Sequence, residues 1–356
     1  MSFELHARVA ERDVSVALEV AEGETVAVLG PNGSGKSTLL AVAAGLLRPD
    51  SGRARLGDRV LFDLQGRGGA AGGRPGRGPW VPPHARGIAL LAQEALLFPH
   101  LTVLDNVAFG ARARGRSRAE AATHARSWLE RVDAIELADR RPAELSGGQA
   151  QRIAVARALA ADPALLLLDE PMAALDVSVA PALRRTLRAV LAGRSAVIVT
   201  HDVLDAFTLA DRVVVLDAGR VVDSGPTAAV LERPRTAFAA GLTGVNLITG
   251  TAHRDGVRTA EGQFVDVRFV ERVVDGAAVA VAVRPAAVAL SAVEPRTSSR
   301  LPGRVTDVEP RGDVVRVRAG ALAADVTPRR AAELDLAPGA TVWFSFAADD
   351  TTAYPL

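Results

Sequence analysis

The segment Gly30-Pro31-Asn32-Gly33-Ser34-Gly35-Lys36-Ser37 decides the fold, because it fits the phosphate-loop pattern GxxxxGK[ST]. An apolar run, 25–29, precedes it and an apolar-striped segment, 37–47, follows it, so we predict a strand, a loop and a helix. Glycines let backbone N–H groups converge on a phosphate, and the helix N-terminus adds its positive dipole end. The pattern places Lys36 on the β- and γ-phosphates of a nucleotide and the Ser37 hydroxyl on Mg²⁺, and we expect Gly30 through Thr38 to bind the nucleotide.

Lys36 is the only lysine in the sequence, whereas arginine is abundant. A lysine ammonium is a compact charge on a flexible stem, and an arginine guanidinium is a planar fork, so the two cannot be exchanged in a narrow phosphate pocket. We infer that position 36 requires an ammonium. The alternative, a glycine-rich turn with an incidental lysine, explains neither this usage nor the flanking segments.

Short apolar runs without period-2 alternation recur up to about residue 233, as expected of strands buried on both faces. Helical segments lie between them, and this alternation predicts an α/β fold with a mostly parallel sheet. The predicted strands are 25–29, 88–91, 165–168, 196–199 and 213–216, and the predicted helices include 37–47, 118–132, 151–161 and 179–191.

The chain has 356 residues, more than one compact domain usually holds, so we predict a large domain, 1–233, and a smaller one, 234–356. Short alternating segments separated by Gly, Pro and Asp indicate that the smaller domain is all-β. Segments 276–283 and 339–346 both place apolar residues at alternate positions after a glycine, which suggests two related β units or a chance match. The Gly/Arg-rich stretch 65–79 is expected to be a flexible surface insertion.

Composition limits the partners. The formal net charge of +1 gives no electrostatic footprint for nucleic acid, so we expect no nucleic-acid partner. The sequence lacks cysteine, which excludes a disulfide framework and fits a reducing cytosol. The first residues lack the order of a secretory signal, and charges interrupt every apolar run before the roughly 18 to 20 residues of a spanning helix. Membrane association is therefore expected to require a partner.

Two carboxylates follow the apolar run 165–168, namely Asp169 and Glu170. Ligands in open α/β sheets bind at the carboxyl ends of the strands, where these acids would lie. We expect Asp169 to hold Mg²⁺, directly or through water, and Glu170 to polarise the attacking water. Two adjacent acids are also common where a strand leaves the sheet, and it is the phosphate loop that favours the catalytic interpretation.

The segment Leu145-Ser146-Gly147-Gly148-Gln149 opens the helix before that strand. A hydroxyl and bare N–H groups at a helix N-terminus suit an anion, although a capped helix start is the simpler alternative. The segment matches in full the signature of the ABC ATPase family, which the chain resembles over nearly its whole length. The resemblance implies a P-loop NTPase cassette, with a mostly parallel sheet, and a small C-terminal all-β, OB-like domain. It also implies a homodimer, in which Ser146, Gly147, Gly148 and Gln149 face ATP held by the second copy.

Three further residues match motifs of this family in the family's order, and their roles are implied by the resemblance. Gln93, after the run 88–91, would contact Mg²⁺ and the attacking water. Asp176, in Ala174-Leu175-Asp176, would lie in a loop that crosses the dimer interface. His201, after the run 196–199, would contact the γ-phosphate.

One feature departs from the family pattern. ABC ATPases usually place an aromatic residue before the phosphate loop to stack on adenine, but no Phe, Tyr or Trp lies between Phe3 and this loop. We expect Arg12 or Val14 to occupy that place.

The resemblance is strongest to ATPases of bacterial importers. The segment Leu97–Val103 with Asn106 resembles their groove for a coupling helix of the permease, and Gly244-Val-Asn246-Leu-Ile248 and Val283-Arg284-Pro285 resemble markers of their regulatory domain. This implies a peripheral subunit on the cytoplasmic face of the cell membrane. Its implied partners are transmembrane permease subunits and, indirectly, an extracytoplasmic solute-binding protein.

The last segment, from Leu322 to Ser345, resembles the molybdate-binding module of molybdate importer ATPases. The solute is therefore expected to be molybdate or another oxyanion. The alternatives are an importer of sulfate, iron(III), polyamine or sugar, and a mainly regulatory ATPase that senses an oxyanion. Ala347 stands where the module has a lysine, so Ser298, Ser299, Arg300 and Thr327 remain as candidate contacts for a molybdate or oxyanion bound by this domain.

Overall fold

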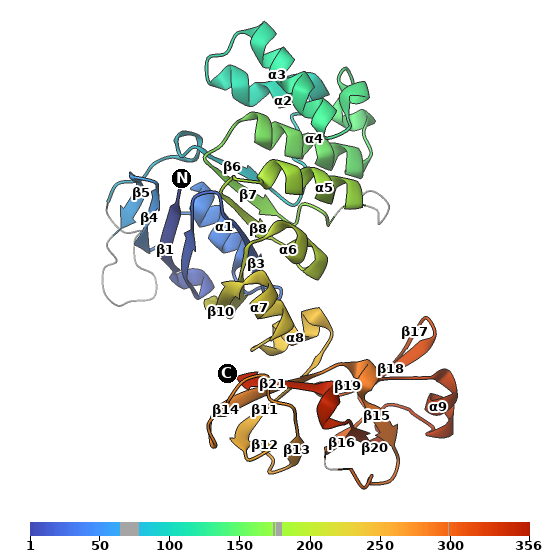
Figure 1. Ribbon diagram of the computed structural model, residues 1–356. Helices are drawn as coiled ribbons and strands as arrows, with labels where there is room; N and C mark the ends of the chain where they lie inside the picture. Colours follow the sequence, from blue (N-terminus) through green and yellow to red (C-terminus); the bar gives the residue numbers. More distant parts are fainter. Residues whose placement is uncertain (65–77, 174, 176–179, 298) are drawn as a thin grey trace. The chain divides into compact units, whose positions relative to one another are not determined.

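The computed structural model describes residues 1–64, 78–173, 175, 180–297 and 299–356 (Figure 1). The chain divides into two compact units, Met1–Thr227 and Ala228–Leu356, and each is described by itself. This division lies a few residues before the expected domain boundary at 233/234. Most of the expected insertion, 65–77, lies outside the described residues.

A six-stranded sheet forms the centre of the first unit, in the order β10-β9-β3-β8-β7-β6. Every neighbouring pair is parallel except β10 with β9, which confirms the predicted mostly parallel sheet. Three predicted strands have the predicted bounds, and the other two are one or two residues longer because polar residues continue the pairing at their ends. The strands are β3 (Thr25–Leu29), β6 (Ile88–Leu91), β7 (Leu165–Asp169), β8 (Ala196–Val199), β9 (Arg212–Asp217) and β10 (Arg220–Pro226).

This sheet is buried on both faces. Along β7, Leu165 and Leu167 join one hydrophobic core, and Leu166 and Leu168 join the other. Helix α1 packs into the first core, while α2, α3, α4, α5 and the end of α6 pack into the second. The helices are α1 (Lys36–Ala44), α2 (Val103–Ala113), α3 (Arg118–Arg131), α4 (Gly147–Ala160), α5 (Ala180–Leu191) and α6 (Val203–Leu209).

Two helix predictions need correction. The predicted helix 151–161 is α4, which begins at Gly147 because the Ser146 side chain caps its first turn. The predicted helix 37–47 is α1, which ends at Ala44 because Gly45 adopts a left-handed conformation (φ 84°). The first residue of the predicted helix 179–191 lies outside the described residues.

A four-stranded antiparallel sheet precedes and flanks α1 in the chain, and we did not predict it. Its order is β2-β1-β4-β5, and its strands are β1 (Phe3–Val9), β2 (Val14–Val20), β4 (Ser51–Leu56) and β5 (Arg59–Leu64). The sequence of β1 does alternate apolar and polar residues, as a strand with one buried face does: Phe3, Leu5 and Val9 are buried, while Glu4 and Arg8 are exposed. The turn between β1 and β2 carries Arg12 to the edge of the site described below.

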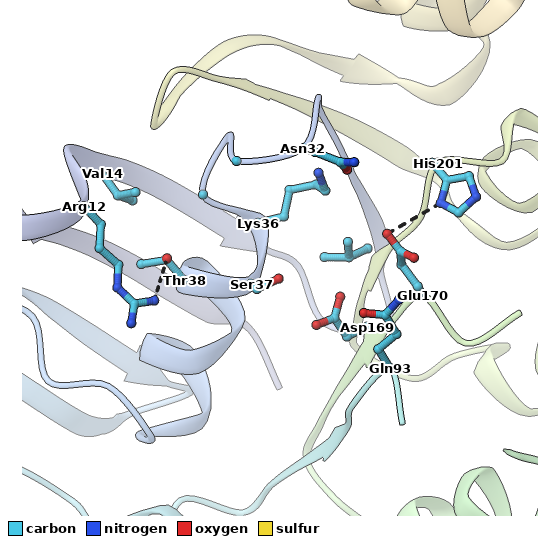
Figure 2. Close-up of a pocket in the computed structure, with 13 residues that line it drawn as sticks. Arg12, Val14, Asn32, Lys36, Ser37, Thr38, Gln93, Asp169, Glu170 and His201 are labelled. Carbon is cyan, nitrogen blue, oxygen red and sulfur yellow. Dashed lines mark hydrogen bonds and ion pairs between the residues drawn. The ribbon is translucent and has the colours of Figure 1, made fainter. Parts of the chain in front are cut away.

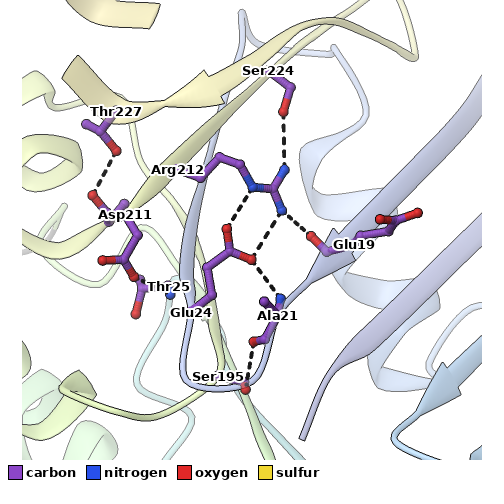
Figure 3. A network of polar contacts seen from close by, with 10 residues as sticks. Glu19, Ala21, Glu24, Thr25, Ser195, Asp211, Arg212, Ser224 and Thr227 are labelled. Atoms are coloured by element: carbon purple, nitrogen blue, oxygen red, sulfur yellow. Dashed lines mark hydrogen bonds and ion pairs between the residues drawn. The ribbon is translucent and has the colours of Figure 1, made fainter. Parts of the chain in front are cut away.

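A polar network holds the start of β3 (Figure 3). Glu24 accepts hydrogen bonds from Nε of Arg212 at 2.7 Å and from the Ala21 amide at 2.7 Å, and Asp211 accepts one from the Thr25 amide at 2.9 Å. Burial would raise the pKa of Glu24, but these hydrogen bonds outweigh it and hold the pKa below its usual range. The strand that leads into the phosphate loop is thus fixed at its first residue.

The second unit contains three sheets and short helices, which confirms the predicted all-β character. The five-stranded sheet has the order β13-β12-β11-β14-β21, and the three-stranded sheets have the orders β15-β20-β16 and β17-β18-β19. The strands are β11 (Asn246–His253), β12 (Gly256–Thr259), β13 (Phe264–Asp266), β14 (Ala278–Val283), β15 (Ala289–Ser291), β16 (Arg300–Arg304), β17 (Asp307–Arg311), β18 (Val314–Ala319), β19 (Leu322–Val326), β20 (Thr341–Ser345) and β21 (Thr351–Pro355), and the helices are α7 (Thr227–Glu232), α8 (Ala237–Thr243) and α9 (Pro328–Glu333).

All three sheets of this unit share one hydrophobic core. The alternating apolar residues of segments 276–283 and 339–346 point into it: Val281 of β14 and Phe344 of β20 are fully buried there. The two segments belong to different sheets. Asn246, buried at the start of β11, ties β19 to this core, because its amide donates to the Ala323 carbonyl at 2.8 Å and its Oδ1 accepts from the Ala323 amide at 2.6 Å.

Candidate functional site

The phosphate loop connects β3 to α1 with the backbone that the sequence predicted. Gly35 (φ 101°) is the N-cap of α1, and a Cβ there would lie 2.9 Å from Cγ2 of Val14. Gly30 has φ 156°, and a Cβ there would lie 2.2 Å from the Leu216 carbonyl oxygen of β9. Only glycine fits these positions, because another side chain would both strain the backbone and push the loop off its neighbours.

Lys36 is held inside the loop. Its side chain is 8% exposed, and its Nζ donates to the carbonyls of Gly30 at 2.7 Å and Pro31 at 2.8 Å. Burial lowers the pKa of Lys36, although the carboxylates of Glu170 and Asp169 oppose this shift. The ammonium is thus partly desolvated, and its hydrogen-bond acceptors among the described residues are neutral carbonyls, so a phosphate oxygen would be a better partner.

A cavity of about 770 Å³ opens beside the loop (Figure 2). It brings together residues that lie far apart in the sequence, and most of them lie at or after the carboxyl ends of the parallel strands β3, β6, β7 and β8. Most of the predicted site residues line it, and Arg12, Val14 and Val199 line it as well. The predicted residues in the lining are Asn32, Gly33, Gly35, Lys36, Ser37, Thr38, Gln93, Asp169, Glu170 and His201.

The other predicted residues do not line the cavity. Gly30 and Pro31 contribute the carbonyls that hold Lys36, and the Ser34 side chain is buried beneath the loop. Ser146, Gly147, Gly148 and Gln149 lie at the start of α4, outside the cavity lining. Asp176 lies outside the described residues.

Asp169 and Glu170 leave the end of β7 into the cavity. Burial raises the pKa of Asp169, as does the Glu170 carboxylate, while Lys36 opposes the rise. Glu170 has a left-handed backbone (φ 46°), and its amide donates to the Val199 carbonyl at 2.9 Å. This conformation turns the Glu170 side chain towards His201, whose Nδ1 lies 3.5 Å from Oε1 of Glu170.

The residues on both sides of His201 belong to a polar network that the sequence did not predict. Asp205 of α6 is 2% exposed and accepts hydrogen bonds from Nε of Arg184 at 2.7 Å and from Oγ1 of Thr200 at 3.1 Å. Oγ1 of Thr200 also accepts a hydrogen bond from the Asp202 amide at 3.1 Å. The residues on both sides of His201 are therefore tied to the α5–α6 packing. The only signal in the sequence was Asp202, a suitable helix N-cap directly after the histidine.

The signature segment forms a capping box at the start of α4. Oγ of Ser146 accepts from the Gln149 amide at 3.3 Å, and Oε1 of Gln149 accepts from the Ser146 amide at 3.0 Å. A Cβ on Gly147 would meet no atom within 4 Å, so the backbone of this turn is open to an incoming group.

The candidate anion contacts of the second unit are engaged in internal contacts. Oγ of Ser299 accepts from the Asp266 amide and donates to the Asp266 carbonyl, and Thr327 caps α9. Arg300 donates to Oε1 of Glu294 at 2.7 Å. Ser298 lies outside the described residues, and Ala347 is exposed.

None of the helices within the described ranges is long and apolar enough to cross a bilayer.

Comparisons with known proteins agree with this architecture. The ABC transporter family model matches residues 14–173, and the TOBE domain model matches residues 295–353. The molybdenum import ATP-binding protein ModC of Mycobacterium tuberculosis is 47% identical, over 99% of this chain and 97% of that protein. The Fe(3+) ions import ATP-binding protein FbpC of Streptomyces avermitilis is 44% identical, over 66% of this chain and 64% of that protein.

A solved structure shares the fold of the first unit. The ATP-binding cassette MJ0796, in a dimeric post-hydrolysis state bound to ADP and Pi, is 28% identical and aligns with a TM-score of 0.53. The match covers 63% of this chain and 98% of the MJ0796 chain. The relative matched over nearly the full length, together with the family models, shows that this chain belongs to the ABC transporter family, as one of its ATP-binding proteins.

Proposed function

We propose that this chain is the ATP-hydrolysing subunit of an importer for molybdate or a related oxyanion. The observation that carries the ATPase part is the convergence of Lys36, Asp169, Glu170 and His201 on one cavity. The solute is inferred from the molybdenum import relative, which matches over 99% of this chain. A sulfate/thiosulfate import relative of Agrobacterium fabrum matches over only 71% of it.

The residues of the cavity would have two roles in hydrolysis: some would bind the phosphates, and one would accept a proton. Lys36 and the amides of the phosphate loop would hold the β- and γ-phosphates, and His201 would contact the γ-phosphate. Glu170 would take the proton of the attacking water, since its carboxylate is beside the space that the terminal phosphate would fill. Thr38 lies one residue after Ser37 on α1 and lines the same cavity.

Mg²⁺ fits the donor atoms of this cavity. Asp169 offers a carboxylate, Ser37 a hydroxyl and Gln93 an amide oxygen, and these are the ligand types that Mg²⁺ prefers. Within the described ranges no group of three or more His, Asp or Glu side chains could hold a metal ion, so phosphate oxygens and water would complete the shell. When bound, the ion would neutralise charge on the phosphates.

A homodimer would complete the site. Residues Ser146–Gln149 lie outside the cavity that holds Lys36, and they present an open helix start, so they suit the terminal phosphate held by a second copy. The dimeric state of the similar MJ0796 cassette supports this arrangement. Closure of two chains on two ATP molecules would supply the conformational change that drives transport, because ATP would favour the closed dimer.

Transport requires membrane partners. We propose that the chain binds transmembrane permease subunits at the cytoplasmic face of the membrane, as a peripheral subunit, and that an extracytoplasmic solute-binding protein delivers the oxyanion to them. The exposed Phe109 and Leu96, near Phe98, would take part in the contact with a permease helix.

Reconstitution tests this proposal. The chain is copurified with its permease, placed in liposomes with the solute-binding protein, and assayed for uptake of molybdate, sulfate and iron(III). We expect ATP-dependent molybdate uptake that Lys36→Ala abolishes and that a tenfold excess of sulfate does not suppress. Uptake of sulfate in preference to molybdate would overturn molybdate as the solute, and uptake of iron(III) in preference would overturn any oxyanion. Hydrolysis that survives Lys36→Ala would overturn the site.

A further inference from the structure

A fully buried arginine lies at the far end of the phosphate-loop helix. Arg86 follows a 3-10 turn, Pro83–Ala85, and comes two residues before β6. Its Nη1 donates to the carbonyls of Val42 at 2.8 Å and Ala43 at 2.9 Å, in the last turn of α1. Its Nε donates to the Val81 carbonyl at 2.9 Å. The guanidinium therefore caps the C-terminus of α1 and ties it to the segment that leads into β6.

The other neighbours of this guanidinium are aromatic rings and backbone. It lies 4.4 Å from the Trp80 ring centre and 5.6 Å from the Phe62 ring centre. A Cβ on Gly45 would lie 2.5 Å from Nε of Arg86, so a glycine after α1 leaves room for the side chain. Nη2 has no hydrogen-bond partner among the described residues, and none of their carboxylates forms an ion pair with Arg86. The protein thus keeps a cation in its interior without an anionic side chain beside it.

This cation keeps its charge at neutral pH. Burial lowers the pKa of Arg86 to about 10, which is still well above neutrality. The group that favours the charge is the C-terminus of α1, where aligned peptide dipoles place a partial negative charge of roughly half a unit. Arg86 offsets this negative end, so the partial positive charge at the other end of α1 acts with less opposition.

The other end of α1 is the phosphate site. Lys36 and Ser37 open the helix and line the cavity. The helix has nine residues, so at about 1.5 Å per residue its ends are about 14 Å apart. At that distance, with an effective dielectric constant of about 20, one unit charge strengthens the binding of an opposite unit charge by up to about sevenfold. Water and salt in the open cavity reduce this effect and do not abolish it.

We propose that Arg86 strengthens the binding of the nucleotide phosphates from the far end of α1, as a positioning residue that acts through the helix and touches no ligand. The inference rests on the proposed ATPase function. The effect grows with the negative charge of the ligand, and ATP carries one more negative charge than ADP. Arg86 therefore favours the substrate over the product, in addition to fixing the last turn of α1.

Nucleotide binding by full-length variants separates charge from hydrogen bonding. Dissociation constants for ADP and ATP are measured by calorimetry for the unchanged chain, Arg86→Lys, Arg86→Gln and Arg86→Met, with EDTA in place of Mg²⁺ so that ATP is not hydrolysed. We expect Arg86→Gln and Arg86→Met to weaken ADP about tenfold and ATP about thirtyfold, because both lack the charge. Arg86→Gln keeps an amide donor for the helix carbonyls. Arg86→Lys keeps the charge and should stay within about twofold of the unchanged chain for both nucleotides.

Arg152→Gln is the matched control. Arg152 is a half-buried arginine that donates to the carbonyls of Val132 and Asp133 at the C-terminus of α3, and α3 contributes no residue to the described lining of the cavity. This variant removes a helix-capping cation from elsewhere in the same unit and should leave both dissociation constants unchanged. An equal loss in Arg152→Gln would show that the effect is not specific to α1 and would overturn the proposal.

The ratio of ATP to ADP affinity decides between charge and a loosened loop. Unchanged binding by Arg86→Gln would overturn the proposal, and so would equal losses for ADP and ATP. Thermal unfolding shows which variants fold. If Arg86→Gln and Arg86→Met do not fold, Arg86→Lys is decisive, because a lower ratio in this charged variant would overturn the proposal and an unchanged ratio would support it. Failure of the proposed function is distinct, since the unchanged chain would then bind neither nucleotide.

Discussion

Nδ1 of His201 lies 3.5 Å from Oε1 of Glu170, at the end of the cavity opposite Arg12. The two side chains differ in their surroundings, since the Glu170 side chain is 19% exposed and that of His201 is 67% exposed. Glu170 is thus the more protected of the two. His201 lies beside Glu170 and lines the same cavity.

The first prediction concerns Glu170→Gln. The amide keeps the shape of the side chain but cannot accept the proton of the attacking water, so hydrolysis should fall at least about 100-fold. ATP binding should persist, and the ATP-bound dimer should accumulate in size-exclusion chromatography with Mg²⁺. Glu130→Gln, on the exposed face of α3, is the control and should hydrolyse ATP normally. Normal turnover by Glu170→Gln would exclude Glu170 as the base.

The second prediction concerns Arg184, which pairs with the buried Asp205. Burial raises the pKa of Asp205, and the hydrogen bond from Arg184 opposes this rise. Arg184→Met should leave a buried carboxylate without its cation and should lower the free energy of unfolding by about 3 to 5 kcal/mol. Urea unfolding measures this change. Arg185→Met, at the exposed neighbouring position, should change it by less than about 0.5 kcal/mol.

A loss in Arg184→Met no larger than in Arg185→Met would show that the pair does not hold the His201 loop. If Arg184→Met folds, its ATPase activity and its affinity for ATP can also be measured. Its ATPase activity should fall more than its affinity for ATP, because His201 would be displaced while the phosphate loop stays intact.

Much of the site followed from local pattern. Lys36 and Asp169 come at the loop after one buried apolar strand and at the end of another, and parallel strands bring their carboxyl ends to one edge; His201 was predicted only from the family resemblance. The predicted convergence of these residues on a cavity is therefore a consequence of the alternation of strands and helices. Short apolar runs predicted the strand bounds well because both faces of the sheet are buried.

What escaped prediction depends on contacts between distant segments. Arg184 and Asp205 find each other only when α5 packs on α6, and neither has a distinctive neighbourhood in the sequence. The antiparallel sheet of β1, β2, β4 and β5 was not predicted although its strands alternate buried and exposed residues, because this alternation is separate from the buried apolar runs that mark the parallel strands. The place of Arg12 in the cavity depends on that sheet.

The third prediction concerns Arg157 of α4. Its Nη1 donates to the Leu96 carbonyl at 2.9 Å, its Nη2 donates to the Ala95 carbonyl at 3.3 Å, and its guanidinium lies 5.2 Å from the Phe98 ring centre. This side chain thus ties the loop after Gln93 to the helix that begins with the signature segment. Arg157 is half-buried, and this burial lowers the pKa of its guanidinium.

Arg157→Met should release the Gln93 loop and lower kcat for ATP about tenfold or more, because small displacements of positioned groups are costly. The KM for ATP should change little, since Lys36 and its loop are untouched. Steady-state ATPase assays measure both constants, with the exposed Arg126→Met as control. If Arg157→Met lowers stability and leaves kcat unchanged, Arg157 has only a structural role.

The fourth prediction concerns acid stability of the second unit. Asp325 of β19 accepts two hydrogen bonds from Arg316 of β18, from Nε and Nη2, each at 2.7 Å. The hydrogen bonds from Arg316 hold the pKa of Asp325 below its usual range, although burial opposes them. Between the folded and unfolded pKa values the unfolded chain binds more protons, so stability rises with pH there. The contribution of the ionised Asp325 carboxylate to stability is complete above an unfolded pKa of about 3.9. It is lost as pH falls through the lower pKa of the folded state.

Asp325→Asn should therefore weaken the protection of the β18 and β19 amides against hydrogen exchange at pH 7. The difference in protection between this variant and the unchanged chain should shrink as pH falls below about 4. Hydrogen-exchange mass spectrometry of peptides from these strands measures this, because comparison at equal pH cancels the intrinsic exchange rate. Asp313→Asn, in the exposed turn between β17 and β18, should have no such effect. A difference that stays constant down to pH 3 would mean that the Asp325 carboxylate contributes by shape and hydrogen bonding alone, since its charge would then have no part in the stability of the sheet.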